Sequence, residues 1–252
     1  MQKARRISPN IYMIYKQKGL TPLEALEAFR EKESIDISVK MTYAGRLDPL
    51  AEGLMLILWG EKCKDKELYM NKEKEYRVNV LLGVQTDTGD VMGKILQNTS
   101  DKNAYTFSVS EISKKIEHLK GKREQTYPQY SSKTVQGKPL WLYMKEDKVV
   151  ELPSHSVTIK DIEILDIYKR EKDDVISEIK KDISSVVGDF RQEDIIKEWE
   201  KSSYDGEFSF ITIKVHCSSG TYMRVLAEEI GGALGGIPAC AYSIERTNIF
   251  LK

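Results

Sequence analysis

The hydrophobic pattern of the chain marks three strands. An apolar run from Leu54 to Trp59, bounded by Gly53 and Gly60, contains no polar residue, so it predicts a strand buried on both faces. Apolar residues alternate with others from Tyr76 to Leu82, which is typical of a strand with one face against a core. A third strand is expected over Phe210 to Cys217.

Helical patterns lie between these strands. A capping box at Thr21 to Glu24 predicts a short helix with an apolar stripe. The stripe consists of Leu23, Leu26 and Phe29. A second capping box, Ser108 to Glu111, begins another helix, and a third is expected from about Tyr222 to Leu234. Strands and helices interleave without a regular βαβ order, which favours a single α+β domain over residues 1–252, with a mixed, largely antiparallel sheet and flanking helices.

Residues 171–206 are predicted to be an insertion between two strands. Two apolar helical stripes, separated by Gly188 and Asp189, indicate a helical hairpin. The stripes are Val175, Ile176, Ile179, Ile183, Val186 and Val187, and then Ile195, Ile196 and Trp199. Residues 169–207 contain eight basic and twelve acidic residues, which argues against phosphate binding. We expect the hairpin to decorate the surface of the domain, and a contact surface for a protein partner or a second copy is the alternative.

Composition narrows the class of protein. The 252 residues are 40% hydrophobic, enough for a sizeable core. The chain has no run of about 18 apolar residues and no basic leader followed by an apolar segment, so we expect a cytoplasmic protein without membrane contact. The three cysteines and three histidines are scattered, a pattern that predicts no metal site.

The formal net charge is zero, but it is unevenly distributed. Outside residues 169–207 the chain has 31 basic and 27 acidic residues, and the basic ones cluster, for example over 62–66 and 114–123. Phosphate binding needs such local clusters and not a high overall charge. A lysine run on a solvated face is the simpler interpretation, so charge alone does not establish phosphate binding.

Two charged residues stand out from their local context. Asp48 lies between Gly45 and Gly53 on the loop before the apolar strand, and Pro49 favours an extended backbone at Asp48. Such a loop could aim a reactive carboxylate, although this segment alone slightly favours a simple turn that begins at Asp48. Arg224 falls in the first turn of its helix, where the helix dipole disfavours a cation by a few tenths of a kcal/mol. A carboxylate partner would offset that cost, and a hydrated arginine is the alternative.

Four blocks of sequence carry a family resemblance. They are GRLDPLAEG from Gly45 to Gly53, the segment from Lys74 to Thr88, the segment from Gln125 to Lys138, and HCSSGTYMR from His216 to Arg224. Together, and in this order, they resemble the TruB-type tRNA pseudouridine synthases. The resemblance extends over roughly residues 11–250 and implies the pseudouridine synthase fold.

The resemblance implies roles for three residues. Asp48 would be the catalytic aspartate that acts on the target uridine, so that the base detaches, rotates and rejoins the ribose through C5. Tyr76 would stack on that base, and Arg224 would pair with Asp48 and favour its charged form. The family's substrate is the uridine at position 55 in the T-loop of tRNA, which must be flipped out of its stack. Such an enzyme needs neither a metal nor a cofactor.

RNA contacts follow from the same resemblance. Residues 124–147 match the family's RNA-gripping insertion and supply the aromatic and cationic side chains that RNA binding requires. The expected substrate-binding and RNA-binding residues are Lys16, Tyr43, Arg46, Tyr127, Lys133, Lys138, Tyr222 and Ile244. Ile244 matches an apolar pocket residue, for which plain core packing is an equally open interpretation. Core packing is likewise the alternative for Tyr76.

The sequence departs from the family pattern at several points. Tyr43 stands where the family usually has histidine, and Gln17 stands where it usually has proline. The chain stops at Lys252, about where the catalytic domain ends in this family, so we expect no C-terminal PUA domain and weaker contact with the acceptor stem. We expect a monomer whose partner is the T-stem-loop of tRNA.

Two other classes of function are compatible with parts of the sequence. A non-catalytic RNA binder or tRNA-folding chaperone could use the same scaffold, but binding alone does not require Asp48, Tyr76 and Arg224 together. A hydrolase using Asp48 with Glu52 would need a second catalytic motif, and the sequence contains none that we recognise. The isomerase is therefore the favoured hypothesis.

Overall fold

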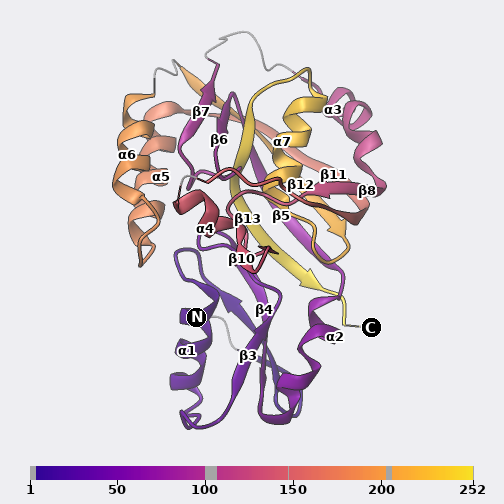
Figure 1. Ribbon diagram of the computed structural model, residues 1–252. Coiled ribbons are helices and arrows are strands. Elements are labelled where there is room, and N and C mark those ends of the chain that lie inside the picture. Colours follow the sequence, from indigo (N-terminus) through magenta and orange to yellow (C-terminus); the bar gives the residue numbers. More distant parts are fainter. Residues whose placement is uncertain (1–3, 100–106, 147, 203–205, 252) are drawn as a thin grey trace.

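One large mixed sheet organises the molecule (Figure 1). The computed structural model describes residues 4–99, 107–146, 148–202 and 206–251. In sheet order the strands are β1 (Arg5–Ser8), β2 (Ile11–Lys16), β4 (Glu52–Trp59), β13 (Ala239–Ile249), β5 (Lys74–Leu82), β12 (Glu207–Cys217), β11 (Ser154–Glu171) and β8 (Gly121–Thr126), and β3 (Met41–Ala44) also pairs with β4. Only the β4–β13 pair is parallel among these described strands. The predicted α+β class with a mixed, largely antiparallel sheet is confirmed.

Helices cover both faces of the sheet (Figure 1). On β5, Tyr76, Val78 and Val80 point into a core shared with α3 (Val109–Ile116) and α7 (Met223–Ala233). Leu81 points to the opposite face, into a second core shared with α5 (Lys172–Ser185) and α6 (Gln192–Lys201). The smaller elements are α1 (Pro22–Lys32), α2 (Lys66–Met70), α4 (Leu140–Lys145), the 3-10 helices Gly60–Asp65 and Glu117–Leu119, and the two-stranded sheets of β6 (Val84–Thr86) with β7 (Ile95–Asn98) and of β9 (Thr134–Val135) with β10 (Lys138–Pro139).

The predicted strand that ends at Trp59 is present as β4, and it is buried on both faces. Leu56 and Leu58 of β4 lie in one apolar cluster, whereas Met55 and Ile57 lie in another beside α1. A strand flanked by two apolar clusters cannot slip by one residue without exchanging its faces. The loop that precedes β4 therefore enters the sheet at a fixed position.

Both predicted capping boxes are present, but the stripe of α1 is not the expected one. Thr21 and Ser108 each accept a hydrogen bond from the backbone of the glutamate three residues later. Leu23 is 58% exposed, so its assignment to the buried stripe was wrong. With about 100° between successive residues, Leu23 lies to the side of the face that is buried. That face consists of Pro22, Ala25, Leu26 and Phe29.

The predicted helical hairpin is present between β11 and β12, as α5 and α6. Its apolar residues pack against the sheet together with Leu81, Phe208 and Phe210, and Trp199 is completely buried. Val187 is 69% exposed, because α5 ends at Ser185 and the expected stripe does not continue that far. The hairpin is thus packed on the rest of the domain, as expected, and its apolar residues complete one of the two main cores.

Gly53 allows β13 to lie beside β4. Its φ is +115°, and a Cβ at this position would lie 2.4 Å from the backbone oxygen of Arg246. No side chain fits at that distance from a strand backbone. Gly137 offers a comparison, since its φ is +80° but a Cβ there would meet nothing within 4 Å.

We predict that Gly53→Ala destabilises the protein more than Gly137→Ala does. Both substitutions place alanine in a left-handed conformation, which costs about 1–2 kcal/mol. Only Gly53→Ala adds a clash with β13, so its free energy of unfolding should fall by about a further 1–3 kcal/mol. Urea unfolding of the two variants measures this difference, and equal losses would contradict the packing argument.

Candidate active site

Asp48 begins a turn at the entrance to β4. The amide of Ala51 donates to the carbonyl of Asp48 at 3.1 Å, which places Pro49 at the second position of a four-residue turn. Leu47 and Leu50 on either side are buried in the two different main cores. Asp48 therefore begins a turn and also presents its carboxylate, because 39% of its side chain is exposed. The two interpretations of this loop are compatible.

Arg224 holds this carboxylate from the buried side. Its side chain is 4% exposed, and its Nε donates to Oδ2 of Asp48 at 2.8 Å. Nη1 donates to the carbonyl of Thr88 at 2.6 Å, and Nη2 donates to the carbonyl of Tyr130 at 3.1 Å and to Oδ1 of Asp48 at 3.5 Å. The carboxylate partner expected from the helix position of Arg224 is thus present. Three separate loops meet at one guanidinium.

Asp90 is a second carboxylate near Arg224, and sequence reasoning missed it. Its Oδ2 lies 3.8 Å from Nε of Arg224, while Oδ1 accepts hydrogen bonds from the Thr88 hydroxyl and the Met92 amide at 2.7 and 3.0 Å. Burial raises the pKa of Asp90. For Arg224, burial alone would lower the pKa, but Asp48 and Asp90 outweigh it and the pKa is raised. The only sequence signal was a polar turn at residues 85–90.

Tyr76 lies below the Asp48 loop. It is 8% exposed and shares a core cluster with Leu47 and Ile244. Burial raises the pKa of Tyr76, with Arg246 opposing and Asp48 adding to the rise, so the phenol is close to both charges. Tyr76 and Ile244 are placed beside the candidate site while also packing in the core, and the two interpretations left open by the sequence are therefore compatible.

Lys16, which the resemblance suggested as a substrate-binding or RNA-binding residue, lies inside the protein. It is completely buried, and its ammonium donates to the carbonyls of Gln17, Leu20 and Pro49 at 3.1, 2.5 and 3.1 Å. Burial lowers the pKa of Lys16 to about 8. All three ammonium protons have protein acceptors, so Lys16 supports the Asp48 loop from beneath and presents no free charge to RNA.

Tyr43 and Arg46 lie together on the strand and loop that lead to Asp48. Nη2 of Arg46 donates to the Tyr43 hydroxyl at 3.5 Å, and Nζ of Lys66 is 5.6 Å from the centre of the Tyr43 ring. Arg46 is exposed and Tyr43 is half-buried. An aromatic ring with two cations beside it is suited to stacking and to phosphate contact.

The 124–147 segment places a second aromatic group beside the site. The Tyr127 ring stacks on His155 with centroids 4.0 Å apart and meets Tyr222 edge-on at 5.7 Å. Nζ of Lys133 is 5.0 Å from the centre of the Tyr127 ring. Gln125, which was not among the expected site residues, binds the backbone of Tyr222 through both ends of its amide, at 2.8 and 3.2 Å. The segment is therefore anchored to the start of α7.

Lys138 is less available than the sequence suggested. It forms an ion pair with Glu146 at 2.5 Å and lies 4.7 Å from the centre of the Tyr143 ring. A phosphate would have to compete with Glu146 for this ammonium.

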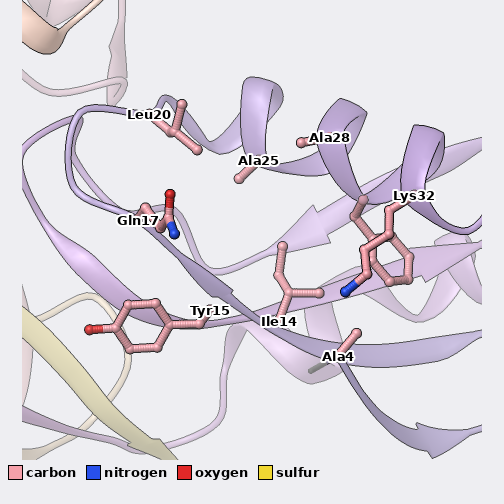
Figure 2. Close-up of a pocket in the computed structure, with 9 residues that line it drawn as sticks. Ala4, Ile14, Tyr15, Gln17, Leu20, Ala25, Ala28 and Lys32 are labelled. Atoms are coloured by element: carbon pink, nitrogen blue, oxygen red, sulfur yellow. The ribbon is translucent and has the colours of Figure 1, made fainter. Parts of the chain in front are cut away.

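The described residues contain no cluster of three or more His, Cys, Asp or Glu side chains suited to a metal ion. In the same ranges, every helix is too short or too polar to cross a lipid bilayer. A cavity of about 50 Å³ lies between β2 and α1 and is lined by Ile14, Ala25 and Phe29 among others. Figure 2 shows Ile14 on the strand and Ala25 on the helix that enclose it. Pockets for small ligands measure about 300–1,000 Å³, so this cavity does not fit a nucleotide. The candidate site is instead the surface around Asp48.

Comparison with known proteins identifies the family of this chain. Residues 32–185 match the N-terminal domain of the TruB family pseudouridylate synthases. The chain belongs to the TruB family. The tRNA pseudouridine synthase B of Endomicrobium trichonymphae is 29% identical over 224 residues, covering 89% of this chain and 78% of the relative. That of Staphylococcus saprophyticus is 32% identical over 237 residues, covering 94% of this chain and 65% of the relative. The chain spans 62% of the corresponding protein of Azoarcus sp..

Solved structures support the fold of this TruB-family chain. A Cbf5-Nop10-Gar1 complex contains a chain that matches with a TM-score of 0.57 and 16% identity, over 95% of this chain and 48% of that one. An H/ACA RNP bound to a substrate RNA containing 2′-deoxyuridine matches with a TM-score of 0.52 and 15% identity, over 95% and 47%. At such low identity the likeness concerns the fold alone. With the family match, it confirms the predicted pseudouridine synthase fold.

Glu228 is a further titratable group beside the candidate site. Glu228 lies one helical turn after Arg224 on α7, and its carboxylate faces Gly89. Burial raises the pKa of Glu228 to about 7; Arg224 opposes this rise, while Glu229 and Asp90 add to it. An unfolded glutamate ionises near pH 4.3. Between these values the folded protein binds more protons than the unfolded chain, so this group lowers stability as the pH rises.

We predict that Glu228→Gln removes this loss. Relative to the native protein, the variant should gain stability between pH 5 and pH 8, on the order of 1 kcal/mol after allowance for partial solvent exposure. Urea unfolding at both pH values measures the gain. Glu193→Gln is the matched control, because the Glu193 side chain is 93% exposed. A pH profile that is the same in the Glu228 variant and the native protein would contradict the assignment.

Proposed function

We propose that this protein isomerises uridine to pseudouridine in tRNA, at position 55 of the T-loop, with Asp48 as the catalytic carboxylate. The observation that carries the proposal is the pairing of a buried Arg224 with an Asp48 whose side chain is 39% exposed. Arg224 orients the carboxylate, and the exposed side of that carboxylate is accessible to a substrate. The membership in the TruB family and the similarity to enzymes named tRNA pseudouridine synthase B support the same reaction.

The reaction needs no external reactant. The bond between uracil N1 and ribose C1′ breaks, a bond between C5 and C1′ forms, and the proton on C5 is lost while N1 gains one. The product is an isomer of the substrate. Asp48 would act on the uridine while Arg224, which donates to both of its carboxylate oxygens, keeps the carboxylate oriented. Tyr76, below the loop, would stack on the base where the C5 proton leaves.

The RNA would lie across the two aromatic groups that flank Asp48. Tyr127 with Lys133 on one side and Tyr43 with Arg46 on the other combine stacking surfaces with cations. A stacked uridine cannot reach Asp48 from within folded RNA, so the base must be flipped at a cost of a few kcal/mol. Recognition of loop shape and backbone is suited to such a surface.

We predict that Asp48→Asn abolishes turnover without unfolding the protein. The amide keeps the size of the side chain and an oxygen for Arg224, so the melting temperature and the affinity for a T-stem-loop RNA should stay close to the native values. Pseudouridine formation in that RNA should fall by about a thousandfold or more. Glu52→Gln, a change at the start of β4, should keep turnover and thereby exclude the hydrolase alternative. Retained turnover in Asp48→Asn would refute the proposed role.

The target can be tested in cells. Pseudouridines are mapped in total RNA from cells with the active protein and from cells with Asp48→Asn. Loss at tRNA position 55 alone is the expected result. Loss at other sites would extend the substrate to further RNAs with a similar loop, and an unchanged map would contradict the proposal.

A further inference from the structure

The inserted hairpin sends one arginine toward the active site. Arg191, the residue before α6, has a left-handed backbone with φ of +63°. Its guanidinium donates to both carboxylate oxygens of Asp87, at 2.6 and 3.3 Å. The same guanidinium lies 4.4 Å from the centre of the Tyr130 ring. Arg191 thus contacts two loops that are far apart in sequence.

These two loops supply the backbone acceptors of Arg224. The carbonyl of Tyr130 accepts from Nη2 of Arg224. The carbonyl of Thr88, the residue after Asp87, accepts from Nη1. Arg191 and Arg224 therefore contact the same pair of loops. The Arg191 and Asp87 side chains are 29% and 15% exposed, so their ion pair is only partly screened by water.

We propose that Arg191 is a positioning residue that fixes Arg224, and through it Asp48, by fastening the 87–88 and 130 loops to the hairpin. This inference rests on the proposed isomerase function. It assigns the 171–206 insertion a role in the reaction, in place of the surface decoration or partner contact expected from sequence.

The hairpin that carries Arg191 is itself held in place by packing and hydrogen bonds. Nε1 of the buried Trp199 donates to the carbonyl of Val91 at 3.1 Å, and the Ile95 amide donates to Glu198 at 2.9 Å. Both bonds join α6 to the segment that follows Asp87. A positioning residue on a packed element transmits its geometry, whereas one on a loose loop does not.

The test replaces Arg191 by asparagine. Asparagine tolerates a left-handed backbone, so Arg191→Asn removes the guanidinium without straining the chain. The single-turnover rate on a T-stem-loop RNA should fall about tenfold, since small displacements of catalytic groups have effects of this order. RNA affinity and melting temperature should stay close to the native values. The control is Lys197→Ala on the exposed side of α6, with an expected rate within twofold of the native one.

A second background separates positioning from a general structural effect. In an Arg224→Lys protein the fork that contacts both carbonyls is already lost, so Arg191→Asn should lower the remaining rate by less than twofold. A tenfold loss in both backgrounds would overturn the proposal, because Arg191 would then act independently of Arg224. An undiminished rate for Arg191→Asn in the native background would overturn it as well.

Hydrogen exchange provides a readout that does not depend on activity. In Arg191→Asn, backbone amides of residues 87–92 and 128–131 should exchange faster than in the native protein, whereas Lys197→Ala should leave them unchanged. Unchanged exchange in Arg191→Asn would refute the inference. Absence of pseudouridine formation by the native protein would instead refute the proposed function, so the two failures are distinguishable.

Discussion

The structure depends on keeping one guanidinium charged inside the protein. Removing an unpaired cation from water costs several kcal/mol, so Arg224 must find acceptors wherever it is buried. It finds them on three loops, at Asp48, Thr88 and Tyr130. Each of these loops is thereby drawn to the N-terminal end of α7. The arrangement leaves one acceptor, Asp48, partly open to solvent, and an exposed carboxylate with a fixed orientation is the consequence.

The two main cores determine where that carboxylate lies. Leu47 anchors one side of Asp48 in the core beneath α7, and Leu50 anchors the other in the core that the hairpin completes. Between them, the buried ammonium of Lys16 binds the carbonyl of Pro49. A loop held at three points has little freedom to move. The entropy cost of ordering it is therefore met when the protein folds and does not weaken substrate binding.

Features that depend on neighbouring residues could be predicted from the sequence, whereas features that depend on distant residues could not. The strand before Trp59 and the capping boxes follow from neighbouring residues, and the conflict of Arg224 with its helix dipole pointed to a carboxylate partner. The burial of Lys16 could not be predicted, because one of its three acceptors, the carbonyl of Pro49, is 33 residues away and is brought to Lys16 only by the fold. Asp90 was hidden for the same reason: its turn looks ordinary until α7 packs against it.

The hairpin shows why overall charge is a poor guide to function. Its acidic composition argued against phosphate binding, and its outward residues agree, since the Glu193, Asp194 and Asp189 side chains are all mostly exposed. Arg191, however, points inward, where it forms an ion pair with Asp87 and lies over the ring of Tyr130. In the proposed function, these outward carboxylates would disfavour the phosphate backbone and leave the surface of Tyr127, Lys133 and Arg46 as the one that RNA contacts. The same insertion would then brace the site through Arg191 while RNA lies on the side where Asp48 is partly exposed.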